Sequence, residues 1–195
     1  MKSPFLIQQN FIPQKICQEI VDLTLDISNE TKVYSEPLSH NYINIHNSFL
    51  EAQIGSHFNT KIINSIISLD SYTESYIPEF TCASTVRKNN MWFRNKDYDF
   101  ETVIFLKSFL ETPPIDTNFE VYGGKLEFPS FGFGLNPERG TSVTFPCVPN
   151  FLNAISEIKI GKLDVLRIFH RSDTMYIYES DQFKGTYIDW FSHLS

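Results

Sequence analysis

The chain has 195 residues, of which 42% are hydrophobic and 20% charged, and its formal net charge is −7. This length suits one sizeable core, and the composition is that of a folded globular chain, which excludes a disordered protein. No run of Lys or Arg could neutralise a row of phosphates, and no apolar stretch approaches the roughly 20 residues of a membrane span. We therefore expect neither a nucleic-acid partner nor a membrane partner.

The amino terminus and the cysteines bear on the compartment. Residues 1–5 read MKSPF and do not begin the long apolar run of a signal peptide. Cys17, Cys82 and Cys147 are odd in number and form no C-x-x-C pair, which favours reduced thiols. We expect a protein that is not secreted by a signal peptide and works in the cytoplasm.

The first third of the chain has helical periodicity. Pro13 stands where a helix start tolerates it, and apolar residues then recur at helical spacing. A polar, turn-prone stretch at 28–47 follows, and a second helical pattern continues less regularly through 62–67. We expect two helices within a helical part of about residues 1–70. Their apolar faces are Ile16, Ile20, Leu23 and Ile27, and then Leu50, Ile54 and Phe58.

From about residue 76 the hydrophobic period changes to two, as in half-buried strands. Residues 102–106 form a β-branched and aromatic run that predicts a central strand. Strands are predicted at 80–87, 102–106, 124–128, 142–145 and 164–169, with a further one at 175–178. The fold class is therefore α+β, mainly β: a jelly roll with two N-terminal helices packed outside. We expect one domain over residues 1–195, with its β part at about 76–195.

The segment YGGKLEFPSFGFGLNPERGTSVTFP, residues 122–146, resembles the prolyl-4-hydroxylase-like 2-oxoglutarate/Fe(II) oxygenases. FIPQKICQEIV resembles the opening helix of these domains, ETVIFLK the strand after their first metal motif, and FKGTYIDWF the end of phage-encoded members. The resemblance implies a double-stranded β-helix. The residues that match the family pattern are Tyr122, Gly123, Gly124, Leu126, Phe128, Pro137, Gly140, Phe145 and Pro146.

The paired glycines in this segment have a physical reason that is independent of the resemblance. Gly123 and Gly124 permit positive φ and a close backbone approach. Leu126 and Phe128, two residues apart, should then point to one face of the following strand. These residues build a frame and carry no chemistry.

The chemistry of the family requires a His-x-Asp pair and a distal histidine, which hold Fe(II) and leave positions open for 2-oxoglutarate and oxygen. No histidine lies between His57 and His170, and Asn153 stands at the distal position. The basic residue that pairs with 2-oxoglutarate falls at Leu163, and Lys162 beside it should point to the opposite face. The resemblance therefore implies degenerate cofactor positions at Asn153 and Lys162. We expect no catalytic residue, no metal and no cofactor.

Candidate metal ligands elsewhere are Asp97, Asp99 and His170. The acidic cluster of Asp97, Asp99 and Glu101 is interpreted first as a solvated loop, and His170 as a surface or strand-end residue. The aromatic residues at 92–100 could line a ligand pocket, but we interpret them first as packing residues. These aromatic residues are Trp92, Phe93, Tyr98 and Phe100.

Three functions remain open on the sequence. The first is a non-catalytic oxygenase-like domain, not an enzyme, that acts as a structural or protein-interaction component of a tailed-phage virion, in its neck or tail. Its partners would be other proteins or further copies of itself, because strand edges rich in Phe favour assembly. The second is an active Fe(II)/2-oxoglutarate hydroxylase with relocated ligands. The third is a jelly roll that binds carbohydrate or another small ligand.

Overall fold

The computed structural model describes residues 3–25, 33–34, 41–78, 85–88, 91–94, 98–147 and 151–173. It is mainly β with two helices, as the sequence predicts. Its centre is an antiparallel six-stranded sheet in the order β1-β11-β6-β14-β3-β2. The bounds of these strands are β1 Leu6–Gln8, β11 Ser142–Pro146, β6 Phe100–Phe105, β14 Lys162–Ser172, β3 Ile62–Thr73 and β2 Val33–Tyr34.

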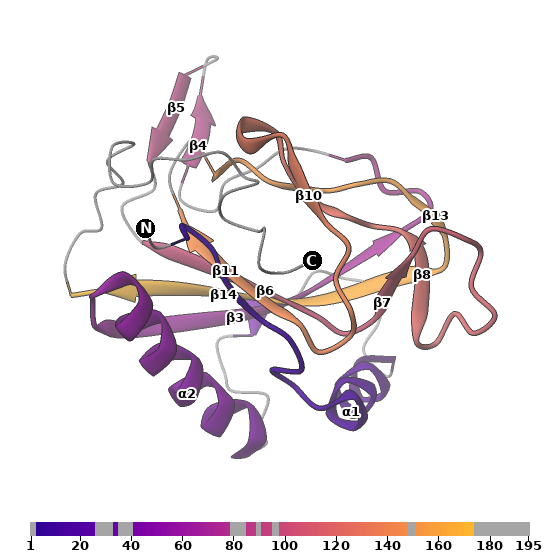
Figure 1. The fold of residues 1–195 in the computed structure, drawn as a ribbon, viewed down its shortest axis with the longest axis horizontal. Helices are drawn as coiled ribbons and strands as arrows, with labels where there is room; N and C mark the ends of the chain where they lie inside the picture. Colours follow the sequence, from indigo (N-terminus) through magenta and orange to yellow (C-terminus); the bar gives the residue numbers. More distant parts are fainter. Residues whose placement is uncertain are drawn as a thin grey trace.

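Both helices, α1 (Gln14–Leu25) and α2 (Asn41–Phe58), lie on one side of this sheet (Figure 1). We call the side of the sheet toward them the helix face. The Pro13 carbonyl accepts the first hydrogen bonds of α1, from the backbone N–H of Ile16 and Cys17, so the predicted start of this helix is confirmed. The core between the helices and the sheet includes Cys17, Ile20, Leu50, Ile54, Phe58, Phe100, Ile104, Leu166 and Ile168.

Short strands cover the opposite side of the sheet, which we call the inner face. They form two three-stranded sheets, β10-β9-β12 and β13-β8-β7, and the two-stranded hairpin β4-β5 stands out from the body (Figure 1). The bounds are β4 Thr85–Lys88, β5 Met91–Arg94, β7 Ser108–Leu110, β8 Glu120–Gly123, β9 Leu126–Phe128, η1 Pro129–Phe131, β10 Phe133–Leu135, β12 Ala154–Ile155 and β13 Ile158–Ile160.

Alternation along the central strands produces the two cores. In β6, Val103 and Phe105 join the inner core while Ile104 joins the helix-face core, and every residue of this strand is buried. A strand buried on both faces needs the β-branched and aromatic run that the sequence shows at 102–106. The predicted strands at 142–145 and 164–169 are likewise confirmed as parts of β11 and β14.

Phe5, just before β1, closes the inner core. Its ring lies 4.9 Å from the ring of Phe128 and 5.3 Å from that of Phe151, both in edge-to-face geometry. Phe131 and Phe133 also lie within aromatic contact distance of it. Aromatic residues that are far apart in the sequence thus pack around one residue near the start of the chain.

The paired glycines behave as the sequence predicts. Gly123 and Gly124 have φ values of 93° and 87°, in the left-handed region that favours glycine. A Cβ on Gly123 would lie 2.2 Å from the backbone oxygen of Glu157, so this position also requires the close approach of the chain. Leu126 and Phe128 are both fully buried in the inner core.

The second helix differs from the prediction at both ends. It begins at Asn41, within the stretch interpreted as turn-prone, and ends at Phe58, after which residues 62–67 belong to β3. Asn59 has a positive φ of 54°, and the Thr60 N–H bonds to the Gly55 carbonyl, which closes the helix. The β-branched residues that follow then pair with β14, so the helical part does not reach residue 70.

The predicted strand at 80–87 is described only where it overlaps β4, and the one at 175–178 lies outside the described residues. None of the helices in the described part is long and apolar enough to cross a membrane.

Candidate functional site

Asn153, at the position that the resemblance assigns to the distal iron ligand, is fully buried just before β12. Its amide nitrogen donates to the Phe151 carbonyl oxygen over 3.3 Å, and its Oδ1 has no hydrogen-bond partner. The Asn153 side chain also lies against the Glu101 carboxyl and favours its ionised form. Asn153 therefore borders a charged group that the sequence did not predict as a site.

This group, the buried ion-pair centre, consists of Asp70, Tyr72, Glu101 and Arg167 on the inner face. The Arg167 guanidinium pairs through Nη1 with the Glu101 carboxylate. Its Nε lies 3.1 Å from Asp70 Oδ2 and donates to the Tyr72 hydroxyl, also over 3.1 Å. Ser68 donates to Asp70 Oδ1 over 2.8 Å and so holds the second carboxylate in place. One guanidinium thus joins two carboxylates and a phenol.

Sheet register brings these residues together. Arg167 on β14 stands opposite Ser68 of β3 and Val103 of β6, while Asp70 and Glu101 lie two residues away from these along their strands. Residues two apart along a strand point to the same face, so all of them reach the inner side. The side chains of Glu101 and Arg167 are only 1% and 9% exposed. The Glu101 carboxylate and the Arg167 guanidinium are therefore shielded from water, whereas Asp70 is 22% exposed.

Burial sets the protonation of the centre. Burial raises the pKa of the Glu101 carboxyl, and the Arg167 guanidinium opposes this rise. Burial also tends to lower the pKa of Arg167, but the charges of Glu101, Tyr72 and Asp70 outweigh it, so this pKa lies above its ordinary value. Burial raises the pKa of Tyr72 to about 12. At neutral pH, Arg167 is charged and Tyr72 is a neutral phenol.

His170, a candidate metal ligand, lies on the helix face rather than with Asn153. Its Nδ1 is 2.8 Å from the Ser65 hydroxyl, and its Nε2 is 2.9 Å from the Thr102 hydroxyl. Ser65 in turn donates to Glu51 of α2 over 2.6 Å. Burial lowers the pKa of His170 to about 3, so the ring is neutral and ties α2 to the sheet.

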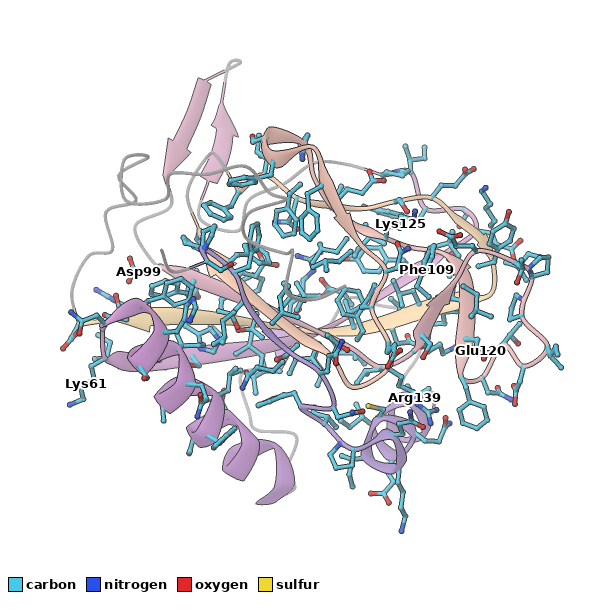
Figure 2. All side chains as sticks on the ribbon, viewed as in Figure 1. Lys61, Asp99, Phe109, Glu120, Lys125 and Arg139 are labelled. Atoms are coloured by element: carbon cyan, nitrogen blue, oxygen red, sulfur yellow. The ribbon has the colours of Figure 1, made fainter. Side chains whose placement is uncertain are left out.

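Asp99, the second candidate, secures the end of β14. Its Oδ2 accepts hydrogen bonds from the backbone N–H and the hydroxyl of Ser172, each over 2.9 Å. Figure 2 shows Asp99 beside this end of the strand. Asp97 lies outside the described residues. Across the described part of the chain, no three His, Cys, Asp or Glu side chains are grouped so that they could hold a metal ion.

Lys162, the other degenerate position, forms an ion pair with Asp164, with 3.0 Å between Nζ and Oδ1. The Lys107 ammonium lies 3.8 Å from the second oxygen of this carboxylate and donates to the Thr117 carbonyl. Leu163 is buried in the inner core. The position assigned to the 2-oxoglutarate partner is thus apolar, and the neighbouring ammonium has a structural partner.

The aromatic candidates are divided by the structure. Phe100 is fully buried and packs against Phe58 of α2 at 4.6 Å between ring centroids. Tyr98 packs against Phe169 at 5.6 Å. The packing interpretation is confirmed for these two residues. The side chains of Trp92 and Phe93, on β5, lie outside the described residues.

The acidic cluster was interpreted wrongly as solvated at two positions: Asp99 is buried against Ser172, and Glu101 lies fully buried within β6. The sequence holds a signal that could have located the centre. Arg167 lies inside the run predicted as a strand at 164–169, and Glu101, of opposite charge, directly precedes the predicted strand at 102–106. Because a buried charge is costly without a partner, each predicts the other. Asp70 has no such signal, since it follows a run that looks helical.

Comparison with known proteins gives a fold. No protein-family model matches the sequence, and no curated protein matches it. Among solved structures, the chain is similar to a viral collagen prolyl hydroxylase from Paramecium bursaria Chlorella virus-1, with a TM-score of 0.69 and 16% identity over 87% of this chain and 90% of that one.

Two further structures support the same fold. A prolyl-4-hydroxylase from Pseudomonas putida has a TM-score of 0.61 and 13% identity, over 88% of this chain and 94% of that one. A prolyl hydroxylase from Trichoplax adhaerens, in complex with a peptide fragment of the hypoxia inducible factor oxygen degradation domain, has a TM-score of 0.57 and 12% identity, over 86% of this chain and 83% of that one. The chain therefore has the prolyl-hydroxylase-like fold.

These structures correct one prediction. We expected from the missing imidazoles that the chain is not an enzyme. That prediction is wrong, because the similar structures named above are prolyl hydroxylases, which points to an enzyme fold. The absence of a metal-ligand group among the described residues does not outweigh this likeness to enzymes.

The fold implies Fe(II) and 2-oxoglutarate, and the described residues do not fit either group. Asn153 offers one amide oxygen where the resemblance places an imidazole, and Leu163 offers no charge to a dicarboxylate. Next to Asn153, the Glu101 carboxylate is already paired with a guanidinium. A metal cation there would have to displace Arg167 or bear its repulsion.

Proposed function

We propose that the chain binds an extended polypeptide and acts as a protein-interaction component built on the prolyl-hydroxylase fold. The fold likeness over 87% of the chain carries this proposal. Two of the similar proteins are named with a polypeptide: one is a collagen prolyl hydroxylase, and the other is in complex with a peptide fragment. A fold used to hold polypeptides offers a surface of suitable shape, whatever chemistry follows.

We place the contact at the hairpin β4-β5, which stands out from the body of the molecule (Figure 1). The sequence from Thr85 to Arg94, TVRKNNMWFR, has three basic residues, two aromatic residues and no acidic one, in a chain of net charge −7. Aromatic and arginine side chains are enriched where proteins bind one another. An acidic, proline-containing segment is the polypeptide that this composition suits.

Two finer features belong to the same proposal. The strands close into a double-stranded β-helix, which is supported by the six-stranded sheet that faces two three-stranded sheets across the inner core. The partner is an assembly component, either another protein or a second copy of the chain, and the setting is a virion such as the neck or tail of a tailed phage. The viral origin of one similar structure is compatible with this setting.

The first prediction concerns peptide binding. Fluorescence anisotropy with labelled acidic, proline-containing peptides should give saturable binding, and Trp92→Ala should weaken it about tenfold, because aromatic anchors commonly contribute more than 1 kcal/mol. Phe49→Ala is the matched control, since Phe49 is an exposed aromatic residue on α2, away from the hairpin. Absence of saturable binding to any such peptide, or equal loss in both variants, would contradict the proposal.

An active hydroxylase is the second candidate, and the names of the similar structures favour it. The same peptides, incubated with Fe(II), 2-oxoglutarate and the chain, separate the two functions by mass spectrometry. Binding without a change in peptide mass supports an interaction role. Gain of one oxygen atom, dependent on both additions, supports the hydroxylase.

A further inference from the structure

The buried ion-pair centre contains two carboxylates, and their negative charge calls for a cation beside them. The Asp70 and Glu101 carboxylates converge on one point of the inner face, and the side chain of Glu101 is 1% exposed. The Asp70 side chain is 22% exposed, but a carboxylate as deeply buried as Glu101 is costly to keep ionised without a positive charge beside it. In this chain the Arg167 guanidinium is that charge, since it contacts both.

The geometry suits arginine in particular. Nη1 reaches Glu101, while Nε lies 3.1 Å from Asp70 and donates to Tyr72, so one planar group serves three oxygen-bearing side chains from three positions in the sheet. A lysine ammonium is a point charge on a flexible stem and cannot match this fork. The centre is therefore built around a guanidinium and not merely around a positive charge.

The centre also adjoins the position at which the resemblance places the distal metal ligand. The Asn153 side chain lies against the Glu101 carboxyl and favours its ionised form, while Asn153 Oδ1 has no hydrogen-bond partner. Buried acceptors without a donor are uncommon.

We propose that the Arg167 guanidinium takes the place of a metal ion in this fold, so that the centre is assembled and held without one. The carboxylates that would otherwise attract a divalent cation are neutralised from within the chain by β14. This inference goes beyond the proposed function and does not depend on it, because peptide binding at the hairpin and the charge balance of the inner face are measured separately.

The second prediction tests this exchange by removing the guanidinium. Arg167→Met leaves Asp70 and Glu101 without their partner and should lower Tm by roughly 10 °C. Mn²⁺, a divalent cation that accepts oxygen ligands, should raise the Tm of this variant by binding the freed carboxylates. The same Mn²⁺ should leave the Tm of the unaltered chain unchanged, because the Arg167 guanidinium already pairs with both carboxylates. Differential scanning calorimetry with and without Mn²⁺ gives all four values.

Arg171→Met is the matched control, since Arg171 lies on the same strand but is exposed. It should retain the Tm of the unaltered chain and show no response to Mn²⁺. The proposal is overturned if Arg167→Met is as stable as this control, or if it folds with the expected loss and shows no rise with Mn²⁺. It is also overturned if Mn²⁺ stabilises the unaltered chain and Asn153→Ala abolishes that effect.

A second variant keeps the test open if Arg167→Met does not fold. Arg167→Lys retains a cation at the centre but loses the fork, so its Tm should fall by less, and Mn²⁺ should not raise it. A Tm rise with Mn²⁺ in Arg167→Lys would count against the proposal, because a resident positive charge should exclude a second one.

Discussion

His170 shows how far the surroundings of one residue can depart from its appearance in the sequence. Read alone, a histidine at a strand end is a candidate ligand. In the structure, both of its ring nitrogens face hydroxyl groups, of Ser65 and Thr102, and the ring is fully buried on the helix face. The sequence could not show this, because the partners are 105 and 68 residues away.

The third prediction follows from the pKa of His170. Burial lowers this pKa from 6.5 to about 3, so the unfolded chain takes up a proton near pH 6.5 that the folded chain refuses. The contribution of the neutral His170 ring to the free energy of unfolding is present in full above pH 6.5. It declines by about 1.4 kcal/mol per pH unit as the pH falls toward 3. Urea unfolding at pH 7.5, 5.5 and 4.5 should show this decline, and His170→Gln should flatten it.

His57→Gln serves as the control for this measurement, since His57 is only half-buried and bonds through Nε2 to the Ser3 carbonyl. Its pH dependence should follow that of the unaltered chain. An equal flattening in both variants would show that the slope does not originate at His170.

At the scale of elements, the strands were more predictable than the helices. The runs at 102–106, 142–145 and 164–169 alternate between two buried faces, so their type follows from residue character alone. The end of α2 was missed because isoleucines at 62–67 fit helical spacing, while their pairing with β14 depends on residues about 100 positions later. The buried ion-pair centre was missed for the same reason, since three separate strands supply it.

The fourth prediction concerns the junction of β8 and β13. Gly123→Ala places a methyl group 2.2 Å from the Glu157 carbonyl oxygen in addition to the strain of a positive φ. Gly132→Ala is the matched control, since Gly132 also has a positive φ, of 59°, but open space around it. Chemical denaturation should show a loss of roughly 1–2 kcal/mol for Gly132→Ala and about 3 kcal/mol or more for Gly123→Ala. Equal losses would mean that only the backbone angle matters.

For the molecule as a whole, the central sheet is shared by two cores. β6 and β14 contribute side chains to the inner core and to the helix-face core alike. Two layers that share their middle strands should unfold together. The single domain expected from length and composition stays a prediction, and joint unfolding of the two layers that share this sheet would support it.

The fifth prediction tests that cooperation. Phe145→Leu weakens the inner core and Ile54→Val weakens the core beneath α2, and the two residues lie on opposite sides of the sheet. Native-state hydrogen exchange should show that each substitution lowers the protection of slow amides in both layers by the same free energy. Protection lost only in the layer that carries the substitution would indicate two independent units.

The position of Phe5 has a practical consequence for anyone who shortens or tags this protein. Its ring packs at the centre of an aromatic cluster. The three residues of β1 that follow it pair with β11 along the edge that faces away from β6. Deletion of the first ten residues would remove the Phe5 ring from the inner core and leave the outer edge of β11 without its neighbouring strand. An affinity handle placed directly before Phe5 would strain the same closure, so it needs a spacer of several residues.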